Sequence, residues 1–518
     1  MKRLVALLLA LPLMAQADTT LRFCAAGSPK TFDPAMTDSG VDHVAHLPIF
    51  GTLVEMRRGT DQFIPGLATS WSISPDGLAY TFALRRAVAW HATDEFKPTR
   101  EFNADDVLFT FGRLLSRDSA FAKALPGVSP YVLSFGWEKL IRKIEKLGSH
   151  EVRITLAERD AAFLHALTLA FAAIESAELG EQLLKAGTPQ RIAQLPVGTG
   201  PFQFKSFRAD SVIRYVKHPR WWDDKPRADQ LVFAITPDAN VRAQRLKRDE
   251  CDIAAPVGPA EQAALRKEAG IKFATAPGMN VGVLAYNTKR PGLSRLDVRQ
   301  ALDMAIDRAA ILRTVYGEAG TLATTILPSA NWAHDPTLKP APHDPARARA
   351  LLQRAGVLPL DITLWAMPVT RTYNPNGQLM AQMIQADWAK VGVKARIVTY
   401  EWGEYLRRID AGEHDAALSG WNGDPEPAGT MGQLACGAAS GTGGWCEPAY
   451  DRLLSEARQA LKQDERKALY AKAQQLVLEQ LPWTPIAYGR PAIPQRAAVK
   501  GFVLDLDGSM YFDGVTPR

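Results

Sequence analysis

The sequence has no apolar run long enough to span a membrane and no block of like charges. Its most marked apolar run, 4–14, is far shorter than the about 20 residues that a transmembrane helix needs. Five like charges stand together nowhere, and the formal net charge of the 518 residues is +6. With 47% hydrophobic and 22% charged residues, the composition is that of a soluble globular protein. These absences exclude a membrane-embedded chain and leave no basic stripe for nucleic acid or a membrane surface.

Motifs for catalysis and metal binding are also missing. The chain contains no G-x-S-x-G, no H-E-x-x-H and no phosphate loop, and its nine histidines lie in no recognisable catalytic setting. A secreted hydrolase would need a nucleophile with a base and an oxyanion hole, so this class is disfavoured. Because no C-x-x-C or cysteine–histidine cluster occurs, we expect neither a metal site nor a cofactor.

The first residues have the pattern of a secretory signal. A basic start precedes the apolar run 4–14, and the A-Q-A sequence at 15–17 provides a cleavage site after Ala17. A lipoprotein is not expected, because Cys24 follows the bulky residues L-R-F instead of the small residues that lipid attachment requires. The mature protein is therefore expected to be exported to an oxidising compartment, most simply the periplasm.

Cysteine is scarce, but its even number is informative. The chain has four cysteines, Cys24, Cys251, Cys436 and Cys446. In an exported protein such a set indicates disulfides, and four cysteines allow three connectivities. Cys436 and Cys446 close a short loop, so we predict that they pair. Cys24 and Cys251 then form a long-range disulfide.

Hydrophobic periodicity alternates between the strand and helix patterns throughout, which predicts an α/β protein. The chain is too long for one compact core, so two or three domains are expected. Alternating residues predict strands at 79–85 and 151–157, and residues 394–400 read as a strand. Helical spacing predicts helices at 297–317, 376–393 and 464–480.

Two short apolar runs, 278–288 and 482–489, read as strands that cross between two lobes and form a hinge. The last 30 residues would then return to the first lobe. The G-T-G-P stretch at 198–201 is interpreted as a turn that links lobes, because its glycines are flexible and its proline is rigid.

Several long motifs resemble one family. "LATSWSISPDGLAYTFALRRAVAWH" (67–91) and "PVGTGPFQF" (196–204) look like signatures of the family 5 extracellular solute-binding proteins of ABC transporters. "WAMPVTRTYNPN" (365–376) and "MIQADWAKVGVKARIVTYEWGEYLRR" (383–408) resemble its dipeptide-binding members. The resemblance covers essentially the whole mature chain.

The resemblance implies a two-lobed periplasmic binding protein of type II. The signal peptide would occupy 1–17. The first lobe would combine 18–278 with 489–518 and carry an extra subdomain at about 50–190. The second lobe would span 279–488. Such proteins close around a ligand by lobe rotation.

A free peptide carries an ammonium group and a carboxylate, so its site needs an acid and a base at a fixed separation. Arg371 and Asp424 both follow strand-like segments, and in α/β lobes ligands gather at the carboxyl ends of strands. The resemblance implies that Arg371 holds the peptide carboxylate, because an arginine fork suits it, and that Asp424 holds the amine. It further implies that Trp402 lines the pocket.

Other contacts are implied more loosely. The segment 38–40, with Ser39 and Gly40, would contribute from the first lobe, and Trp421 stands beside the loop of Asp424. That loop is shorter here than in the family's dipeptide binders, so Glu426 is a candidate to share the role of Asp424 and substrate preference is open. The resemblance implies a short peptide ligand, a membrane permease as partner and a monomeric state. The alternative cargoes are haem, nickel, an antimicrobial peptide or another small solute.

Overall fold

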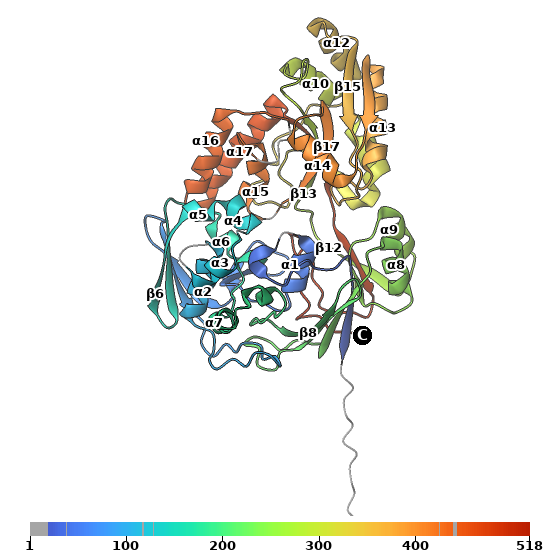
Figure 1. Cartoon of the computed structure of the whole chain (residues 1–518). Helices are drawn as coiled ribbons and strands as arrows, with labels where there is room; N and C mark the ends of the chain where they lie inside the picture. The colour runs from blue at the N-terminus through green and yellow to red at the C-terminus, as the bar shows by residue number, and fades with distance from the viewer. Residues whose placement is uncertain (1–18, 38, 116–118, 128, 424, 439–442) are drawn as a thin grey trace, which may run out of the picture.

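The computed structural model describes residues 19–37, 39–115, 119–127, 129–423, 425–438 and 443–518. Two main bodies are stacked in it, each built on a mixed sheet flanked by helices (Figure 1). We call the body on the seven-stranded sheet, with its subdomain, the first lobe, and the body on the six-stranded sheet the second lobe. Within the described residues, no helix combines the length and apolarity that crossing a membrane requires. The predicted signal peptide, 1–17, lies outside the described residues.

The first lobe is built on a seven-stranded sheet with the order β12-β19-β11-β1-β10-β9-β8. One face of β1 (Thr20–Ala25) buries Leu21 and Phe23 in the lobe's core, while Arg22 between them is exposed. The other strands are β8 (Phe202–Arg208), β9 (Val212–Lys217), β10 (Gln230–Ile235), β11 (Ile253–Ala254), β12 (Ile271–Thr275) and β19 (Ala492–Arg496). Its helices are α1 (Gly40–His46), α8 (Ala239–Lys247) and α9 (Pro259–Leu265).

An extra subdomain with its own hydrophobic core extends the first lobe. It contains a four-stranded antiparallel sheet of order β4-β5-β7-β6 and a two-stranded sheet. The strands are β2 (Val54–Met56), β3 (Phe63–Pro65), β4 (Ala68–Ile73), β5 (Ala79–Leu84), β6 (Ile141–Gly148) and β7 (Glu151–Leu156). The helices are α2 (Ala104–Leu114), α3 (Ala120–Ala124), α4 (Pro130–Phe135), α5 (Trp137–Leu140), α6 (Phe163–Ala166) and α7 (Ala177–Lys185).

The second lobe is built on a six-stranded sheet with the order β14-β18-β13-β17-β15-β16. Its strands are β13 (Asn280–Tyr286), β14 (Gly320–Leu322), β15 (Leu360–Trp365), β16 (Val393–Val398), β17 (Ala416–Asn422) and β18 (Trp483–Gly489). Its helices are α10 (Leu296–Ala305), α11 (Arg308–Ile311), α12 (Pro345–Ala355), α13 (Gly377–Lys390), α14 (Trp402–Asp410), α15 (Pro427–Met431), α16 (Pro448–Gln459) and α17 (Gln463–Gln480). The predicted strands at 278–288, 394–400 and 482–489 are therefore confirmed.

The chain passes between the sheets where β12 leads into β13 and where β18 leads into β19. These two connections lie side by side: the Asn280 side-chain amide donates to the Gly489 carbonyl at 2.9 Å and its oxygen accepts from the Gly489 amide at 2.8 Å. A Cβ on Gly278 would stand 1.7 Å from the Gly489 oxygen, so only glycine fits there. The last residues lie with the first lobe, where β19 joins the seven-stranded sheet and Phe502 and Phe512 are buried in the core.

Two local predictions are wrong. The helix predicted over 297–317 is interrupted, because Ile306 is extended and the Asp307 side chain caps a new turn by accepting from the Ala310 amide. The stretch 198–201 joins the subdomain to β8 within the first lobe and does not link the lobes. Its glycines serve close packing: a Cβ on Gly198 would stand 2.0 Å from the Ile49 oxygen.

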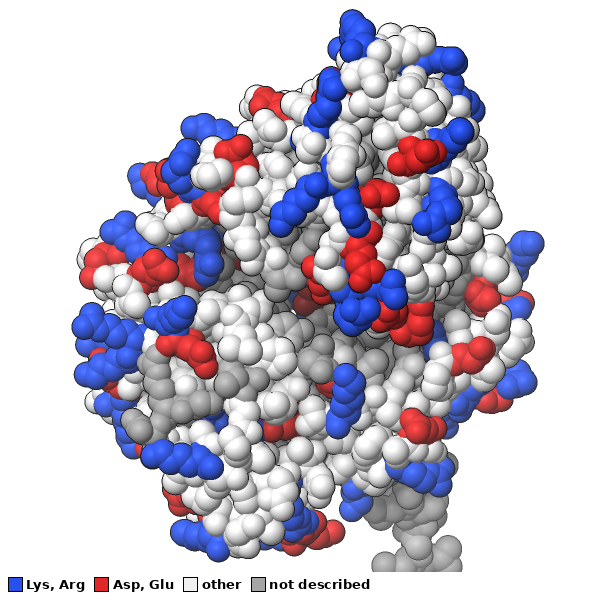
Figure 2. Space-filling model, turned by 45° about the horizontal axis from the view of Figure 1, so that its top comes forward, with Lys and Arg blue, Asp and Glu red and all other residues white. Residues whose placement is uncertain are grey.

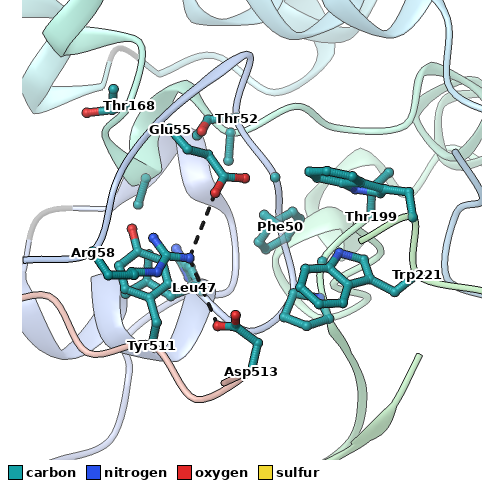
Figure 3. A pocket seen from close by; sticks show the side chains of 17 residues that line it. Leu47, Phe50, Thr52, Glu55, Arg58, Thr168, Thr199, Trp221, Tyr511 and Asp513 are labelled. Atoms are coloured by element: carbon teal, nitrogen blue, oxygen red, sulfur yellow. Dashed lines mark ion pairs between the residues drawn. The ribbon is translucent and has the colours of Figure 1, made fainter. Parts of the chain in front are cut away.

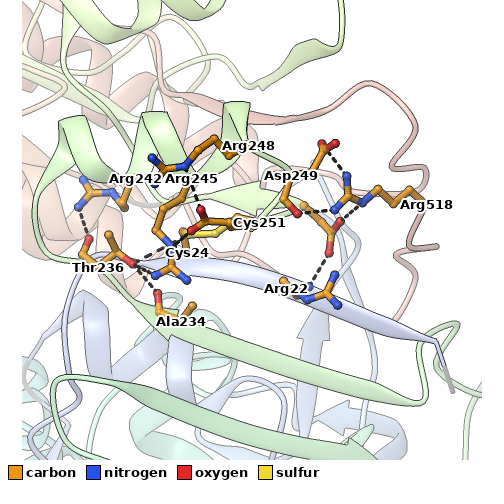
Figure 4. The surroundings of a disulfide bond; sticks show 12 residues. Arg22, Cys24, Ala234, Thr236, Arg242, Arg245, Arg248, Asp249, Cys251 and Arg518 are labelled. Carbon is orange, nitrogen blue, oxygen red and sulfur yellow. Dashed lines mark hydrogen bonds and ion pairs between the residues drawn. A yellow bond between two sulfur atoms is a disulfide. The ribbon is translucent and has the colours of Figure 1, made fainter.

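Both predicted disulfides are present. Cys24 of β1 is bonded to Cys251, whose segment leads into β11, with their Cα atoms 5.8 Å apart. Figure 4 shows this disulfide beneath the arginines of α8. Cys436 and Cys446 close their short loop with Cα atoms 4.6 Å apart.

Candidate ligand-binding cleft

The surface is hollowed between the two lobes (Figure 2). On the second-lobe side, strands β17, β15 and β16 run parallel and in that order. The carboxyl ends of parallel neighbours meet at one edge of a sheet, and ligands of α/β lobes bind there. Arg371 follows β15 and Trp402 follows β16. The next two strands across the sheet are β13 and β18. β13 begins at this edge and β18 ends at it, next to the connections to the first lobe.

The loop that carries Arg371 lies directly on three strands of this edge, because each strand has a glycine beneath it. A Cβ on Gly282 would stand 2.2 Å from the Tyr373 oxygen, and a Cβ on Gly420 would stand 2.2 Å from the Tyr373 ring. A Cβ on Gly489 would stand 2.0 Å from the Thr372 oxygen. Any side chain at these positions would therefore displace the loop.

Hydrogen bonds hold this loop in one conformation. The backbone amide of Arg371 donates to the Asn374 carbonyl at 2.9 Å, and the Asn374 amide donates back at 3.0 Å. The buried Tyr316 hydroxyl donates to the Tyr373 carbonyl at 2.6 Å. Because the backbone is fixed at both ends of the turn, the position from which the Arg371 side chain extends is fixed as well.

The Arg371 guanidinium lies beside an aromatic ring. It lies 5.3 Å from the centre of the Trp402 ring, and its Nη1 donates to the Thr370 carbonyl at 3.2 Å. Burial raises the pKa of Tyr373, and the nearby Arg371 charge lowers it in part. Among the described residues, no carboxylate forms an ion pair with Arg371. A cation with an aromatic neighbour and no partner among the described carboxylates is suited to an incoming carboxylate.

Trp402 is held in place by its packing on a buried tyrosine. It opens α14 and stacks on Tyr405 with ring centres 5.8 Å apart and an angle of 18° between the planes. The Tyr405 hydroxyl donates to the Leu418 carbonyl at 2.7 Å and lies 3.2 Å from the Trp365 carbonyl. The half-buried Trp402 ring thus forms a fixed apolar platform beside Arg371.

The first-lobe residues Ser39 and Gly40 begin helix α1. The Ser39 hydroxyl caps the helix by accepting from the Asp42 amide, and it donates to the Asp42 carboxylate at 2.7 Å. Gly40 is exposed, and a Cβ there would meet nothing within 4 Å. A role of these two residues in binding therefore stays a prediction.

Trp421, another residue of the predicted set, lies on β17. It follows Gly420, and successive side chains of a strand point to opposite faces. Since Gly420 faces Tyr373, Trp421 faces away and packs against the core formed by α16, α17 and neighbouring loops. Asp424 lies outside the described residues.

Glu426 does not take over the role of an exposed acid. It is 7% exposed, and its carboxylate accepts from the Arg466 guanidinium at 2.5 Å. It also caps α15 by accepting from the Ala428 amide. Burial raises the pKa of Glu426, while Arg466 lowers it in part. This arrangement does not support the hypothesis that Glu426 shares the work of Asp424, because the buried carboxylate is already paired with Arg466.

Sequence reasoning missed the support of the site. Tyr316 and Tyr405 were not singled out, and nothing in their surroundings in the sequence distinguishes them from core tyrosines. The glycines did carry a signal, because a glycine within a strand pattern such as 278–288 marks a close backbone approach.

A separate cavity lies inside the first lobe (Figure 3). Its volume is about 50 Å³, far below the roughly 300–1,000 Å³ of ligand pockets. Arg58 stands 3.2 Å from the centre of the Tyr511 ring on one side, and Trp221 lies on the other. The described part of the chain brings no three histidine, cysteine or acidic residues together as a metal site would.

The comparisons with known proteins identify the class. Residues 62–442 match the model of the bacterial extracellular solute-binding proteins, family 5. The chain belongs to this family, and its fold is the two-lobed fold of periplasmic binding proteins.

Two curated relatives span nearly the whole chain. The dipeptide-binding protein of Pseudomonas aeruginosa is 48% identical over 506 residues, which are 96% of this chain and 95% of that protein. Heme-binding protein A of Haemophilus influenzae is 38% identical over 506 residues, which are 96% and 92% of the two chains.

Two solved structures are similar over the same extent. The structure of HbpA2 from Haemophilus parasuis has a TM-score of 0.89 and 34% identity, and the match covers 96% of this chain and 100% of that one. A dipeptide binding protein from Pseudoalteromonas sp. SM9913, in complex with Met-Leu, has a TM-score of 0.84 and 36% identity with the same coverage.

Proposed function

We propose that the protein is the periplasmic substrate-binding component of an ABC transporter and that it captures dipeptides or other short peptides between its lobes. The observation that carries this proposal is the Arg371 guanidinium. It is fixed at the cleft edge of the second lobe, faces Trp402 and forms no ion pair with a described carboxylate. The 48% identity with a dipeptide-binding protein over nearly the full length supports the same cargo.

In this proposal two opposite charges hold the two ends of the peptide. Arg371 binds the terminal carboxylate with its guanidinium fork, and Asp424 binds the terminal ammonium group. The peptide backbone hydrogen-bonds to strand edges, so side-chain identity matters less than the two ends. Trp402 covers the peptide, and Ser39 and Gly40 contact it from the first lobe. Closure excludes water and strengthens both charge contacts, because the local dielectric constant falls.

The lobes are proposed to comprise 18–278 with 489–518 and 279–488. They would rotate about the paired connections at 278–282 and 486–490, where Asn280 and Gly489 are hydrogen-bonded. Closure of this kind delivers the ligand to a membrane permease. A signal peptide cleaved after Ala17 would export a monomer to the periplasm.

A second cargo is favoured by one relative. Heme-binding protein A is 38% identical over most of both chains, so haem is the alternative ligand. Haem carries carboxylates that Arg371 would also bind, but it has no ammonium group for Asp424. The two proposed ligands can therefore be distinguished by whether binding requires a free amine.

The test is a calorimetric titration of the mature protein after unfolding and refolding, with its disulfides intact, to remove bound ligand. Met-Leu, several other free dipeptides, their N-acetylated forms and haem are titrated separately. The proposal predicts binding of free dipeptides and marked weakening on acetylation. Binding of haem with no binding of any free dipeptide would overturn the peptide assignment.

A further inference from the structure

The two lobes touch at a second place, on the side of the molecule where α16 stands over α4 and α5 (Figure 1). Arg458, on α16 of the second lobe, donates from Nη2 to Asp160 Oδ2 of the first-lobe subdomain at 2.5 Å. The backbone amide of Ala161 donates to the Arg458 carbonyl at 2.8 Å. A charged and a backbone hydrogen bond thus join the lobes away from the connections between the sheets.

The first-lobe half of this contact is rigid. The other oxygen of Asp160 accepts from the Ala162 amide at 2.9 Å, so the carboxylate is fixed before Arg458 reaches it. Arg159 donates to the Asp76 carbonyl at 2.7 Å and ties this segment to the turn between β4 and β5. Leu461 of the second lobe lies against the same turn, since a Cβ on Gly77 would stand 2.8 Å from it.

The second-lobe half is braced in the same manner. Arg466 on α17 donates to the Ala457 carbonyl of α16 at 3.0 Å, and the same guanidinium pairs with buried Glu426. The corner between α16 and α17, which carries Arg458, is therefore held to the body of its own lobe. Two fixed surfaces meet here, so the contact depends on the relative position of the lobes and not on loop conformation.

We infer that Arg458 and Asp160 form an interlobe latch that sets ligand affinity by stabilising the closed arrangement before ligand binds. The inference rests on the proposed function, because it needs lobes that open and close around a ligand. Both residues would act through the position of the lobes and not by contact with the ligand, since neither follows a strand of the ligand-binding edge. Asp160 is 4% exposed and the Arg458 side chain 43% exposed, so lobe opening would return the carboxylate to water and leave no unpaired buried charge.

The latch acts by raising the fraction of molecules in the closed arrangement. A ligand that binds only the closed arrangement has an apparent dissociation constant that rises as the closed fraction falls. A partly exposed ion pair is a modest contact, so its loss should weaken ligand binding by up to roughly fivefold. Loss of a contact that acts only in local folding would change stability without this effect.

The test compares Asp160→Asn, Arg458→Gln and the double variant with the wild type. Asparagine keeps the oxygen that accepts from the Ala162 amide, so the first-lobe turn is preserved. Arg452→Gln is the control, because Arg452 lies exposed on the same helix and its loss changes the charge equally. The measurements are the radius of gyration by small-angle X-ray scattering, without and with saturating Met-Leu, and the dissociation constant for Met-Leu.

The latch predicts a larger radius of gyration for the ligand-free single variants, an unchanged radius for the ligand-bound forms and the weakened binding stated above. The double variant should be no weaker than either single variant, because both remove one contact. Unchanged radius and affinity in both single variants would overturn the inference. If wild-type protein binds no peptide, the proposed function fails, whereas the ligand-free scattering still decides whether the latch exists.

Discussion

At the residue scale, the site depends on positions where a side chain is absent as much as on Arg371 itself. Gly282, Gly420 and Gly489 come from three adjacent strands, and each lets the backbone of one loop lie on the sheet. The guanidinium is therefore positioned by the strands beneath its loop. This arrangement makes the glycines sensitive to changes that an exposed loop would tolerate.

Gly420→Ala is expected to weaken peptide binding. The new methyl group would stand 2.2 Å from the Tyr373 ring and 2.6 Å from the Val281 carbonyl, so the Arg371 loop must shift. Overpacking of this kind costs about 1–3 kcal/mol of stability. Urea unfolding and peptide titration measure both effects. Gly432→Ala is the control, because a Cβ there meets nothing within 4 Å. Wild-type affinity in Gly420→Ala would contradict the role of the loop.

Glu426→Gln separates a structural acid from a ligand-binding acid. The substitution leaves the Arg466 guanidinium buried without its anion, which typically costs about 3–5 kcal/mol. At a temperature where the variant is folded, we expect lower stability in urea unfolding and a peptide dissociation constant that rises no more than in Arg458→Gln, because Glu426 and Arg466 brace the corner that carries Arg458. A large loss of affinity in folded Glu426→Gln would restore the hypothesis that Glu426 binds the peptide amine.

At the element scale, the strands predicted from the sequence are present, and so are two of the three predicted helices. The helix predicted over 376–393 begins at its Asn376 cap and ends before Gly392, which has a φ of 92°. Prediction failed where a side chain changed the backbone, as at Asp307. It also failed at Gly198, because a glycine in the sequence can indicate either a flexible turn or a close contact of the backbone, and the sequence does not distinguish the two.

A pair of buried histidines at the junction of the subdomain and the seven-stranded sheet predicts pH-dependent stability. The His91 and His218 rings are 4.8 Å apart, and His91 hydrogen-bonds to the Gly200 carbonyl at 2.9 Å. Burial lowers the pKa of His91 to about 3 and that of His218 to about 4. The unfolded chain therefore binds more protons than the folded one between about pH 6.5 and 4, so these groups lose their stabilising contribution as the pH falls through that window.

His91→Gln tests this directly, because glutamine keeps a donor for Gly200 and removes a titrating group. From pH 7 to 5 the variant should lose less stability than the wild type, by about 2 kcal/mol for one such histidine. Urea unfolding at the two pH values gives this difference. An equal loss in both proteins would show that His91 does not titrate differently on folding.

At the scale of the whole molecule, the sequence was informative about architecture and less so about the cleft. The two strands that continue between the lobes were found from their apolar character, and the structure places Asn280 beside Gly489. The cleft residues come from segments far apart in the chain, so periodicity cannot bring them together. Arg371 and Trp402 were inferred from the resemblance to the family. Trp421 faces away from the Arg371 loop, because neighbouring residues of a strand point to opposite faces of the sheet.

The cross-lobe contact of Arg458 and Asp160 shows the same limit. The two residues are 298 positions apart in the chain, and neither belongs to a motif. Only the relative placement of the lobes makes them partners. Contacts that depend on lobe position are therefore visible in the structure and not in the sequence.

The most direct test of the account is whether Arg371 binds the terminal carboxylate of a peptide. Met-Leu and its C-terminal amide are titrated into wild-type protein, Arg371→Gln and the control Arg354→Gln, whose exposed arginine lies on α12 at the far end of the second lobe (Figure 1). Wild type and control should prefer the free peptide by about 30-fold or more, as for a desolvated charge pair. Arg371→Gln should bind both forms weakly and equally. If it keeps the full preference for the free carboxylate, another group holds that end and the central claim is wrong.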